Sequence, residues 1–472
     1  MVFTSEVFLL FFLPALLFCY FLIPQKFINC RNLVLFLFSI VFYGWGGAGY
    51  LFLFVASMAA NYLGGLAVGC FKSKAMKKVS LIITIAVGLG LLGVFKYAGF
   101  FTGMLYGAGV LNGVISFALP IGISFYTFQG LSYVIDVYRG DAEVQKDPLK
   151  VCLYIALFPQ LVAGPIVRYT DVERELISRS HSVEGFSDGA VRFMLGFGKK
   201  MLMANPMGEI ADKVFAHVGT ELLTSPAAWV GAVAYAFQIY FDFSAYSDMA
   251  IGLGKIFGFR FNENFNYPYI SASVTEFWRR WHISLSTWFR DYVYIPLGGN
   301  RCSKFRHIIN LSVVWFLTGM WHGASWNFIL WGVYYGALLI LEKYVLAGAL
   351  KRIPRPVSHI VTMLAVLVGW VFFRAETLTD AASFLGAMVS GPADFSEAFY
   401  LLRQYLPEFV ICIIGIFPVK GFLEKWLNEE SAGVTKAVLA EILPKVFAVT
   451  VFALSYMKLV SGSFNPFIYF RF

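Results

Sequence analysis

Long apolar runs separated by short polar stretches make up most of the chain. A run of about 20 residues forms a helix long enough to cross the roughly 30 Å hydrocarbon core of a bilayer. The pattern therefore predicts an all-α polytopic membrane protein. Several runs are shorter, so we expect some helices to be tilted or re-entrant, with about eleven crossings in all. The runs are Val7–Ile23, Leu33–Tyr43, Leu51–Val68, Val79–Phe95, Val114–Val137, Val151–Ile166, Ala190–Ala204, Ala227–Ala250, Ile308–Met320, Phe328–Leu341, Val357–Phe373, Phe409–Phe417 and Val446–Val460.

One stretch without an apolar run, residues 262–306, interrupts this pattern. It is too charged to span a bilayer and too aromatic for a disordered loop. We expect it to lie at the membrane interface or to dip into it. No repeat and no Pro- or Ser-rich linker divides the chain, so residues 1–472 should form a single membrane domain.

Basic residues in the first part of the chain predict its orientation. Two lie in the first loop and four lysines lie between residues 72 and 78, whereas Gly44–Tyr50 and Thr102–Gly113 hold none. Since cytoplasmic loops are enriched in Lys and Arg, the N-terminus should face the outside and the lysine cluster the cytoplasm. No basic residue precedes the first run, Val7–Ile23, so we expect a retained membrane helix rather than a signal peptide.

Composition narrows the class of protein further. Apolar residues make up 59% of the 472 residues and charged residues 14%, against about 45–50% and 25% in soluble proteins. Basic loops account for the net charge of +9, which indicates no nucleic-acid partner. The six cysteines stand at least 11 residues apart, and the chain has no Walker A, GxGxxG or HExxH motif. We therefore expect neither a metal site nor a bound cofactor.

The first candidate for chemistry lies on an amphipathic helix. Ser273, followed by Glu276 three residues later, forms a capping box and predicts one helix over Val274–Tyr292. An apolar stripe on one face and charged residues on the others favour an interfacial position. His282 lies beside the stripe, four residues after Trp278, so its imidazole should face aromatic side chains. The structural alternative is a packed histidine bonded to a neighbouring carbonyl.

His322 is the sharper candidate, because it lies in an uncharged stretch between residues 307 and 342 and hence at membrane depth. Gly319 and Gly323 should leave room beside the imidazole for a ligand. A helix-packing hydrogen bond to a neighbouring polar side chain, such as Thr318 or Asn327, is the alternative.

A neutral histidine in a dry pocket suits acyl transfer. Its ordinary pKa of about 6.5 lets it take the proton of a hydroxyl while that hydroxyl attacks a carbonyl. Neither a GxSxG elbow nor a His followed five residues later by Asp competes for this role. We expect His322 to be the catalytic base. The residues expected to bind substrate, from the same tryptophan-rich stretch, are Trp278, Trp281, Trp321 and Asn327.

Charged residues inside apolar runs should be paired, because a buried charge persists only with a partner. Asp242 and Asp248 should find Arg279 or Arg280 on the arginine-rich helix. Structural pairing is also the expected role of Arg374.

Four motifs resemble the membrane-bound O-acyltransferase family, in its bacterial branch that acts on polysaccharides. The motifs are PQLVAGPIVRY (Pro159–Tyr169), YFDFSAYSDMAIGLG (Tyr240–Gly254), the segment Asn264–Arg301 and TGMWHGASWNFILWG (Thr318–Gly332). The resemblance covers essentially the whole chain. It implies a ring of about eleven membrane helices around a central pore, with re-entrant helices that carry the site. It also implies that His322 is the catalytic histidine and His282 a second essential one.

The same resemblance implies a function in the bacterial inner membrane. A cytoplasmic thioester, acetyl-CoA or an acyl carrier protein, would give its acetyl group for the O-acetylation of an extracytoplasmic polysaccharide such as alginate. An extracytoplasmic acceptor protein would take part, and the final acceptor would be a polysaccharide hydroxyl. The alternatives are D-alanyl transfer to teichoic acid within the family, a polysaccharide transporter or pore, and a structural scaffold for an export complex. A transporter should show inverted repeats, and none is detected.

Overall fold

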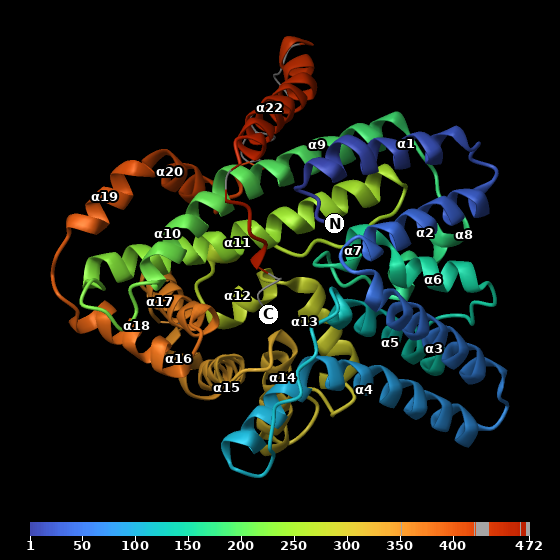
Figure 1. The fold of residues 1–472 in the computed structure, drawn as a ribbon, viewed down its shortest axis with the longest axis horizontal. Coiled ribbons are helices and arrows are strands. Elements are labelled where there is room, and N and C mark those ends of the chain that lie inside the picture. Colours follow the sequence, from blue (N-terminus) through green and yellow to red (C-terminus); the bar gives the residue numbers. More distant parts are fainter. Residues whose placement is uncertain (351, 420, 422–433, 463, 469–472) are drawn as a thin grey trace. The chain divides into compact units, whose positions relative to one another are not determined.

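The computed structural model describes residues 1–350, 352–419, 421, 434–462 and 464–468. This part of the chain is built of helices and contains no β-strand (Figure 1). The predicted all-α class is thereby confirmed. The chain divides into two compact units, and the divisions fall inside helices α9 and α11 and after Asn262.

The first unit comprises Met1–Phe193 and Met249–Asn262. Its elements are η1 (Phe8–Phe12), α1 (Leu13–Leu22), α2 (Ile28–Gly44), η2 (Ala48–Tyr50), α3 (Leu51–Cys70), α4 (Lys74–Gly107), α5 (Ile123–Arg139), α6 (Pro148–Ala156), α7 (Phe158–Leu161), α8 (Tyr169–Ile177), most of α9 (Val183–Gly198) and the last turns of α11 (Ser225–Ile256). The predicted run Val114–Val137 is helical only from Ile123. Pro120 cannot donate a helix hydrogen bond, and Gly122 adopts a left-handed φ of 74°.

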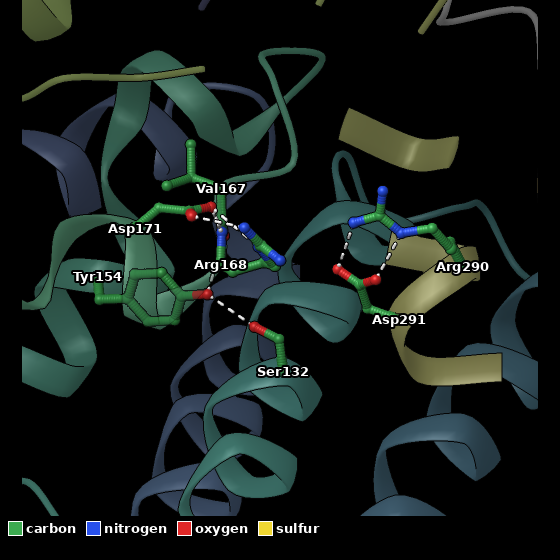
Figure 2. A network of polar contacts seen from close by, with 7 residues as sticks. All are labelled: Ser132, Tyr154, Val167, Arg168, Asp171, Arg290 and Asp291. Carbon is green, nitrogen blue, oxygen red and sulfur yellow. Dashed lines mark hydrogen bonds and ion pairs between the residues drawn. The ribbon is translucent and has the colours of Figure 1, made fainter. Parts of the chain in front are cut away.

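Helices α3, α4 and α5 pack side by side in this unit (Figure 1). A hydrogen-bond network joins α5 and α6 to the segment before α8 (Figure 2). The Tyr154 hydroxyl lies 2.9 Å from the Ser132 hydroxyl and donates to the Val167 carbonyl, also at 2.9 Å. Arg168 forms an ion pair of 2.8 Å with Asp171 in the first turn of α8. These bonds satisfy polar groups that the apolar surroundings would otherwise leave unpaired.

The second unit comprises Met194–Asp248 and Glu263–Phe472. Its elements are the end of α9, η3 (Lys199–Ala204), α10 (Asn205–Phe215), most of α11, η4 (Pro268–Ile270), α12 (Val274–Arg280), α13 (Ile283–Phe289), η5 (Arg290–Tyr294), α14 (Lys304–His322), α15 (Trp326–Leu341), η6 (Glu342–Leu346), α16 (Ala347–Leu350), α17 (Arg355–Arg374), α18 (Leu378–Ser390), α19 (Ser396–Gln404), α20 (Leu406–Gly415) and α22 (Val434–Val460).

Five helices in the described part of the chain are long and apolar enough to span a membrane, or six if the pair α19 and α20, bent by 73°, forms one span. The five are Leu51–Cys70, Lys74–Gly107, Trp326–Leu350, Arg355–Arg374 and Glu441–Val460. Shorter apolar helices accompany them at Phe8–Leu22, Ile28–Gly44 and Leu378–Ser390. The protein is therefore a multi-pass membrane protein, and the figure of about eleven crossings stays a prediction.

The single helix predicted from Val274 to Tyr292 is wrong. The cap is as expected, since the Ser273 hydroxyl accepts from the Glu276 backbone N–H at 3.0 Å. The helix nevertheless stops at Arg280, because the Arg280 carbonyl accepts from the backbone N–H of Asn266 at 2.9 Å. The backbone N–H of Ile283 then donates to the Asn264 carbonyl at 2.9 Å instead of to the preceding helical turn. The backbone of Asn264 and Asn266 thus takes the hydrogen bonds that a continuous helix needs.

Glycines bring α14 and α15 into close backbone contact. A Cβ atom on Gly319 would collide with the carbonyl oxygen of Phe328 and lie 3.2 Å from the Gly332 Cα. A Cβ atom on Gly323 would meet the Phe328 ring. The expectation that both glycines leave room for a ligand is therefore wrong, because the neighbouring helix fills this space.

This packing predicts that Gly332→Ala destabilises the protein by about 1–3 kcal/mol, the usual range for overpacking. The new methyl group would meet the backbone carbonyl of Trp315, which cannot move away by changing rotamer. Thermal unfolding of the detergent-solubilised protein measures the effect. Gly90→Ala in α4 is the matched control, since nothing lies within 4 Å of its Cβ position. Equal unfolding temperatures for the two variants would contradict the prediction.

Candidate active site

A small, partly open pocket lies in the second unit. Its lining is aromatic and aliphatic apart from one imidazole. The lining residues are Ile239, Phe243, Trp281, His322, Trp331, Trp370, Phe373 and Ile468. His322 is the one residue of this lining with an ionisable side chain.

His322 is the last residue of α14, where the chain turns toward α15. Its side chain is 8% exposed. The imidazole centroid lies 4.9 Å from the Trp331 ring and 5.1 Å from the Phe373 ring, both in edge-on geometry. The rings limit the orientation of the imidazole while leaving it in the pocket wall, so a ligand in the pocket would touch it.

The aromatic wall is held in place by hydrogen bonds behind it. The indole N–H of Trp370 donates to the Tyr269 hydroxyl at 3.0 Å, and this hydroxyl donates to the Ala236 carbonyl at 2.6 Å. Trp281 packs against Trp370 with ring centroids 4.8 Å apart. Because both indoles are backed by fixed neighbours, the pocket has a defined shape without a ligand.

His282 lies at the break between α12 and α13, with a left-handed φ of 44°. Few residues other than glycine adopt this conformation, and it occurs preferentially at functional sites. The side chain is 1% exposed. Its Nδ1 lies 3.1 Å from the Asn264 Oδ1, and its ring meets the Phe243 ring edge-on at 4.6 Å.

The hydrogen bonds of Asn264 assign the tautomer of His282. The Asn264 Oδ1 accepts from the Ser284 backbone N–H at 3.2 Å and from the Ser284 hydroxyl at 2.9 Å, while the Asn264 Nδ2 donates to the Ser247 hydroxyl at 3.0 Å. The amide oxygen therefore faces His282, and Nδ1 of the imidazole must carry the proton. Nε2 keeps its lone pair, and among the described residues nothing hydrogen-bonds to it. Burial lowers the pKa of His282 to about 3, so the ring is neutral at physiological pH.

The predicted substrate-binding residues differ in their position relative to the pocket. Trp281 lines the pocket. The Trp321 ring centroid lies 5.0 Å from that of His322 and 6.0 Å from that of His282, so this indole contacts both histidines. Trp278 lies outside the lining, in an aromatic cluster whose nearest ring centroid is 4.7 Å away.

Asn327 also lies outside the lining, and its side-chain amide donates to the Ala375 carbonyl at 2.6 Å. The Thr318 hydroxyl donates to the Val314 carbonyl at 2.8 Å, within its own helix. Both side chains therefore satisfy backbone carbonyls.

Several pocket residues were not among the predicted site residues. They are Ile239, Phe243, Trp331, Trp370, Phe373 and Ile468 in the lining, and Asn264 behind His282. Trp331 could have been predicted as a site residue, because it belongs to the tryptophan-rich stretch around the two histidines. The others come from apolar runs or from irregular backbone, where periodicity says nothing of which residue faces a pocket.

The expected pairing of Asp242 and Asp248 with Arg279 or Arg280 is wrong. Lys200 Nζ lies 2.8 Å from Asp242 Oδ1, and Lys199 Nζ lies 2.6 Å from Asp248 Oδ2. Both lysines lie at the start of the π-helix η3, and both aspartates lie on α11. Arg280 instead pairs with Glu276 on its own helix at 2.9 Å.

The expected structural pairing of Arg374 is confirmed. Its guanidinium forms an ion pair with the Asp212 carboxylate at 2.5 Å. Among the described residues, no three His, Cys, Asp or Glu side chains gather in a group that could hold a metal ion.

Comparisons with known proteins agree with this picture. Residues 144–373 match the family model described as MBOAT, membrane-bound O-acyltransferase family. The chain is 42% identical to the probable alginate O-acetylase AlgI of Azotobacter vinelandii and 39% identical to that of Pseudomonas aeruginosa, and both alignments cover 100% of each chain. It is also 32% identical to the peptidoglycan O-acetyltransferase of Helicobacter pylori, over 82% of this chain and 80% of that one.

The neutral state of His282 predicts a pH-dependent stability. The folded chain keeps this ring unprotonated down to pH about 3, whereas the unfolded chain protonates it below about 6.5. The unfolded state then binds more protons, so the free energy of unfolding falls with decreasing pH, by up to about 1.4 kcal/mol per unit.

His282→Asn should weaken this dependence, because asparagine tolerates the left-handed backbone but does not titrate. Thermal unfolding at pH values from 7 to 4.5 measures it. His359→Asn serves as a control for loss of a histidine elsewhere in the same unit. If the unfolding temperatures of His282→Asn and the wild type fall equally with decreasing pH, burial of this imidazole does not cause the acid sensitivity.

Proposed function

Because the chain belongs to the membrane-bound O-acyltransferase family, we propose that it moves an acetyl group from a cytoplasmic thioester across the membrane for the O-acetylation of an extracytoplasmic polysaccharide such as alginate. The protein is an acyltransferase of this family and a multi-pass membrane protein. The acetyl group, the direction of transfer and the polysaccharide are the parts that we propose.

The observation that carries the proposal is the position of His322. A single ionisable side chain lies in the wall of an apolar pocket, at the end of a helix within the membrane protein. An apolar pocket excludes water, which would otherwise hydrolyse the thioester, and it strengthens the electrostatic effect of the imidazole.

The reaction needs one base and no further group in this pocket. His322 takes the proton of the acceptor hydroxyl as its oxygen attacks the thioester carbonyl. The new carbon–oxygen bond forms, the carbon–sulfur bond breaks, and the imidazolium returns the proton to the departing thiolate. Products are the acetyl ester and the free thiol, so atoms and charge balance.

We assign His282 a role in positioning the donor or the acceptor. Its neutral ring presents an Nε2 lone pair that accepts a hydrogen bond but holds no charge. Trp321 contacts both imidazoles and gives them a common wall. We expect Trp278, Trp281 and Asn327 to contribute to substrate binding, with Trp281 nearest to the acetyl group because it lines the pocket.

The proposal includes a topology. The protein lies in the bacterial inner membrane, surrounded by lipid, as a single membrane domain with its N-terminus outside. About eleven helices form a ring around a central pore, and re-entrant helices carry the site. Acetyl-CoA or an acetylated carrier protein reaches the pocket from the cytoplasm. On the outer side, an acceptor protein relays the acetyl group to the polysaccharide hydroxyl.

His322→Gln tests the assigned base. The variant should lower kcat by at least about 100-fold, the lower limit for the loss of a general base. The measurement is transfer of labelled acetyl from a thioester by the full chain in proteoliposomes. His217→Gln is the matched control, since His217 lies against Glu397, away from the pocket lining. Near-normal turnover in His322→Gln would disprove the assignment of the base.

The same assay separates the alternatives. An enzyme consumes the thioester, whereas a polysaccharide transporter or a scaffold leaves it intact. Supplying D-alanyl carrier protein beside the acetyl donors distinguishes acetyl transfer from D-alanyl transfer, because only one donor should be used. Preference for the alanyl donor would overturn the acetyl assignment but keep the acyltransferase.

The lysine cluster at residues 72–78 predicts a dependence on salt. Its side chains lie at the start of α4 and are mostly exposed to solvent. Replacing Lys72, Lys74, Lys77 and Lys78 by Gln should raise KM for the anionic donor about tenfold at low salt, with kcat unchanged, because the cluster attracts the donor without touching the reacting atoms. The difference should shrink at high ionic strength. An unchanged KM would place donor entry elsewhere.

A further inference from the structure

One residue of the pocket lining comes from a short segment that follows the last helix of the chain. Ile468 belongs to residues 464–468, which follow α22. The side chain of Ile468 is 3% exposed and lines the same pocket as His322. A segment of irregular backbone is held at this depth only if its polar groups have partners.

Buried polar side chains supply those partners. The backbone N–H of Ile468 donates to Asp242 Oδ2 at 2.8 Å. Lys200 Nζ donates to the carbonyl oxygen of Pro466. The Asn205 side-chain amide donates to Asn465 Oδ1 at 3.2 Å. Residues from η3, α10 and α11 therefore hold segment 464–468 against this unit.

The ion pair between Lys200 and Asp242 is itself buried. Their side chains are 4% and 1% exposed, and the charged atoms are 2.8 Å apart. Two desolvated charges attract each other, but they remain costly unless their other hydrogen-bonding positions are also filled. Here segment 464–468 fills one such position on each residue, with an N–H for Asp242 and a carbonyl for Lys200. The pair and the segment thus depend on each other.

We propose that Ile468 determines the length of acyl group that the pocket accepts, and that the Lys200–Asp242 pair positions it. The inference rests on the proposed acyl transfer through this pocket. Isoleucine is suited to form such a wall, because its β-branched side chain has few rotamers and cannot swing aside. Phe243 and Ile239 line the same pocket from α11, the helix that carries Asp242, so one helix supports both parts of the wall.

The expected size of the effect follows from pocket chemistry. One methylene more or less in an apolar pocket changes kcat/KM by about 10-fold to 200-fold. Ile468→Ala removes several carbon atoms from the wall. The ratio of kcat/KM for butyryl to that for acetyl donors should rise at least about tenfold. Ile468→Phe should act in the opposite sense and lower acetyl transfer, because the larger side chain occupies the space.

The experiment uses the full chain in proteoliposomes with acetyl, butyryl and hexanoyl thioesters, each carried on coenzyme A and on a purified acyl carrier protein. Ile210→Ala is the matched control, since Ile210 is 1% exposed but lies outside the pocket lining. It should lower thermal stability and leave the butyryl-to-acetyl ratio at the wild-type value. A similar ratio change in Ile210→Ala and Ile468→Ala would overturn the inference.

A double variant tests the positioning role of the ion pair. Lys200→Met with Asp242→Leu replaces two buried charges by apolar side chains of similar size, so neither charge is left unpaired. The double variant also removes the two hydrogen bonds that the ion pair makes to segment 464–468. We expect the butyryl-to-acetyl ratio to rise as in Ile468→Ala, which loss of stability alone would not cause. An unchanged ratio in a folded double variant would remove the positioning role.

The outcomes separate the inference from the proposed function. If the wild type transfers no acyl group from any thioester, the proposed function fails. If the wild type transfers acetyl and Ile468→Ala keeps the wild-type ratio, the inference alone fails. Thermal unfolding of each variant establishes that it is folded before the ratios are compared.

Discussion

The hydrogen bonds of Asn264 are the interaction on which the candidate site depends. Its backbone carbonyl and side-chain oxygen take the N–H groups of Ile283 and Ser284, so the helix before them cannot continue. The interruption forces His282 into a left-handed conformation, and the same amide oxygen receives its Nδ1 proton. Asn264 therefore helps to break the helix, together with the bond from the Asn266 N–H to the Arg280 carbonyl. Its side chain sets the tautomer of His282 and thus which ring nitrogen keeps the lone pair. Residues in strained conformations persist only when their surroundings hold them, and this arrangement supports the role that we propose for His282.

The tryptophan rings of the pocket have two effects that small apolar side chains would not have. Trp281, Trp331 and Trp370 fill space with rigid side chains that lose little entropy on packing, so the pocket keeps its shape. In the reaction that we propose, their apolar faces also exclude water from the thioester, whose hydrolysis would compete with transfer to a hydroxyl. The position of the His322 imidazole in this apolar lining is thus consistent with acyl transfer, the chemistry of the family.

Buried charge follows a different rule from buried apolar surface in this protein. The buried Lys200 is paired with Asp242 and the half-buried Arg374 with Asp212, both across helices, as desolvation requires. The Lys200–Asp242 pair also forms hydrogen bonds with the backbone of residues 464–468, and so holds the segment that carries the pocket residue Ile468. An ion pair that holds irregular backbone beside a pocket contributes to the shape of that pocket as well as to stability.

The apolar runs by themselves determined the all-helical membrane class, and the uncharged context of His322 was enough to single it out. The cap at Ser273 was also predictable, because it depends on residues three positions apart. Only the tertiary structure decided the break before His282, the lysine partners of Asp242 and Asp248, and the presence of Ile468 in the pocket. The physical reason is distance along the chain. Helical periodicity relates neighbours up to four residues apart, whereas these contacts join residues separated by 14 to 226 positions.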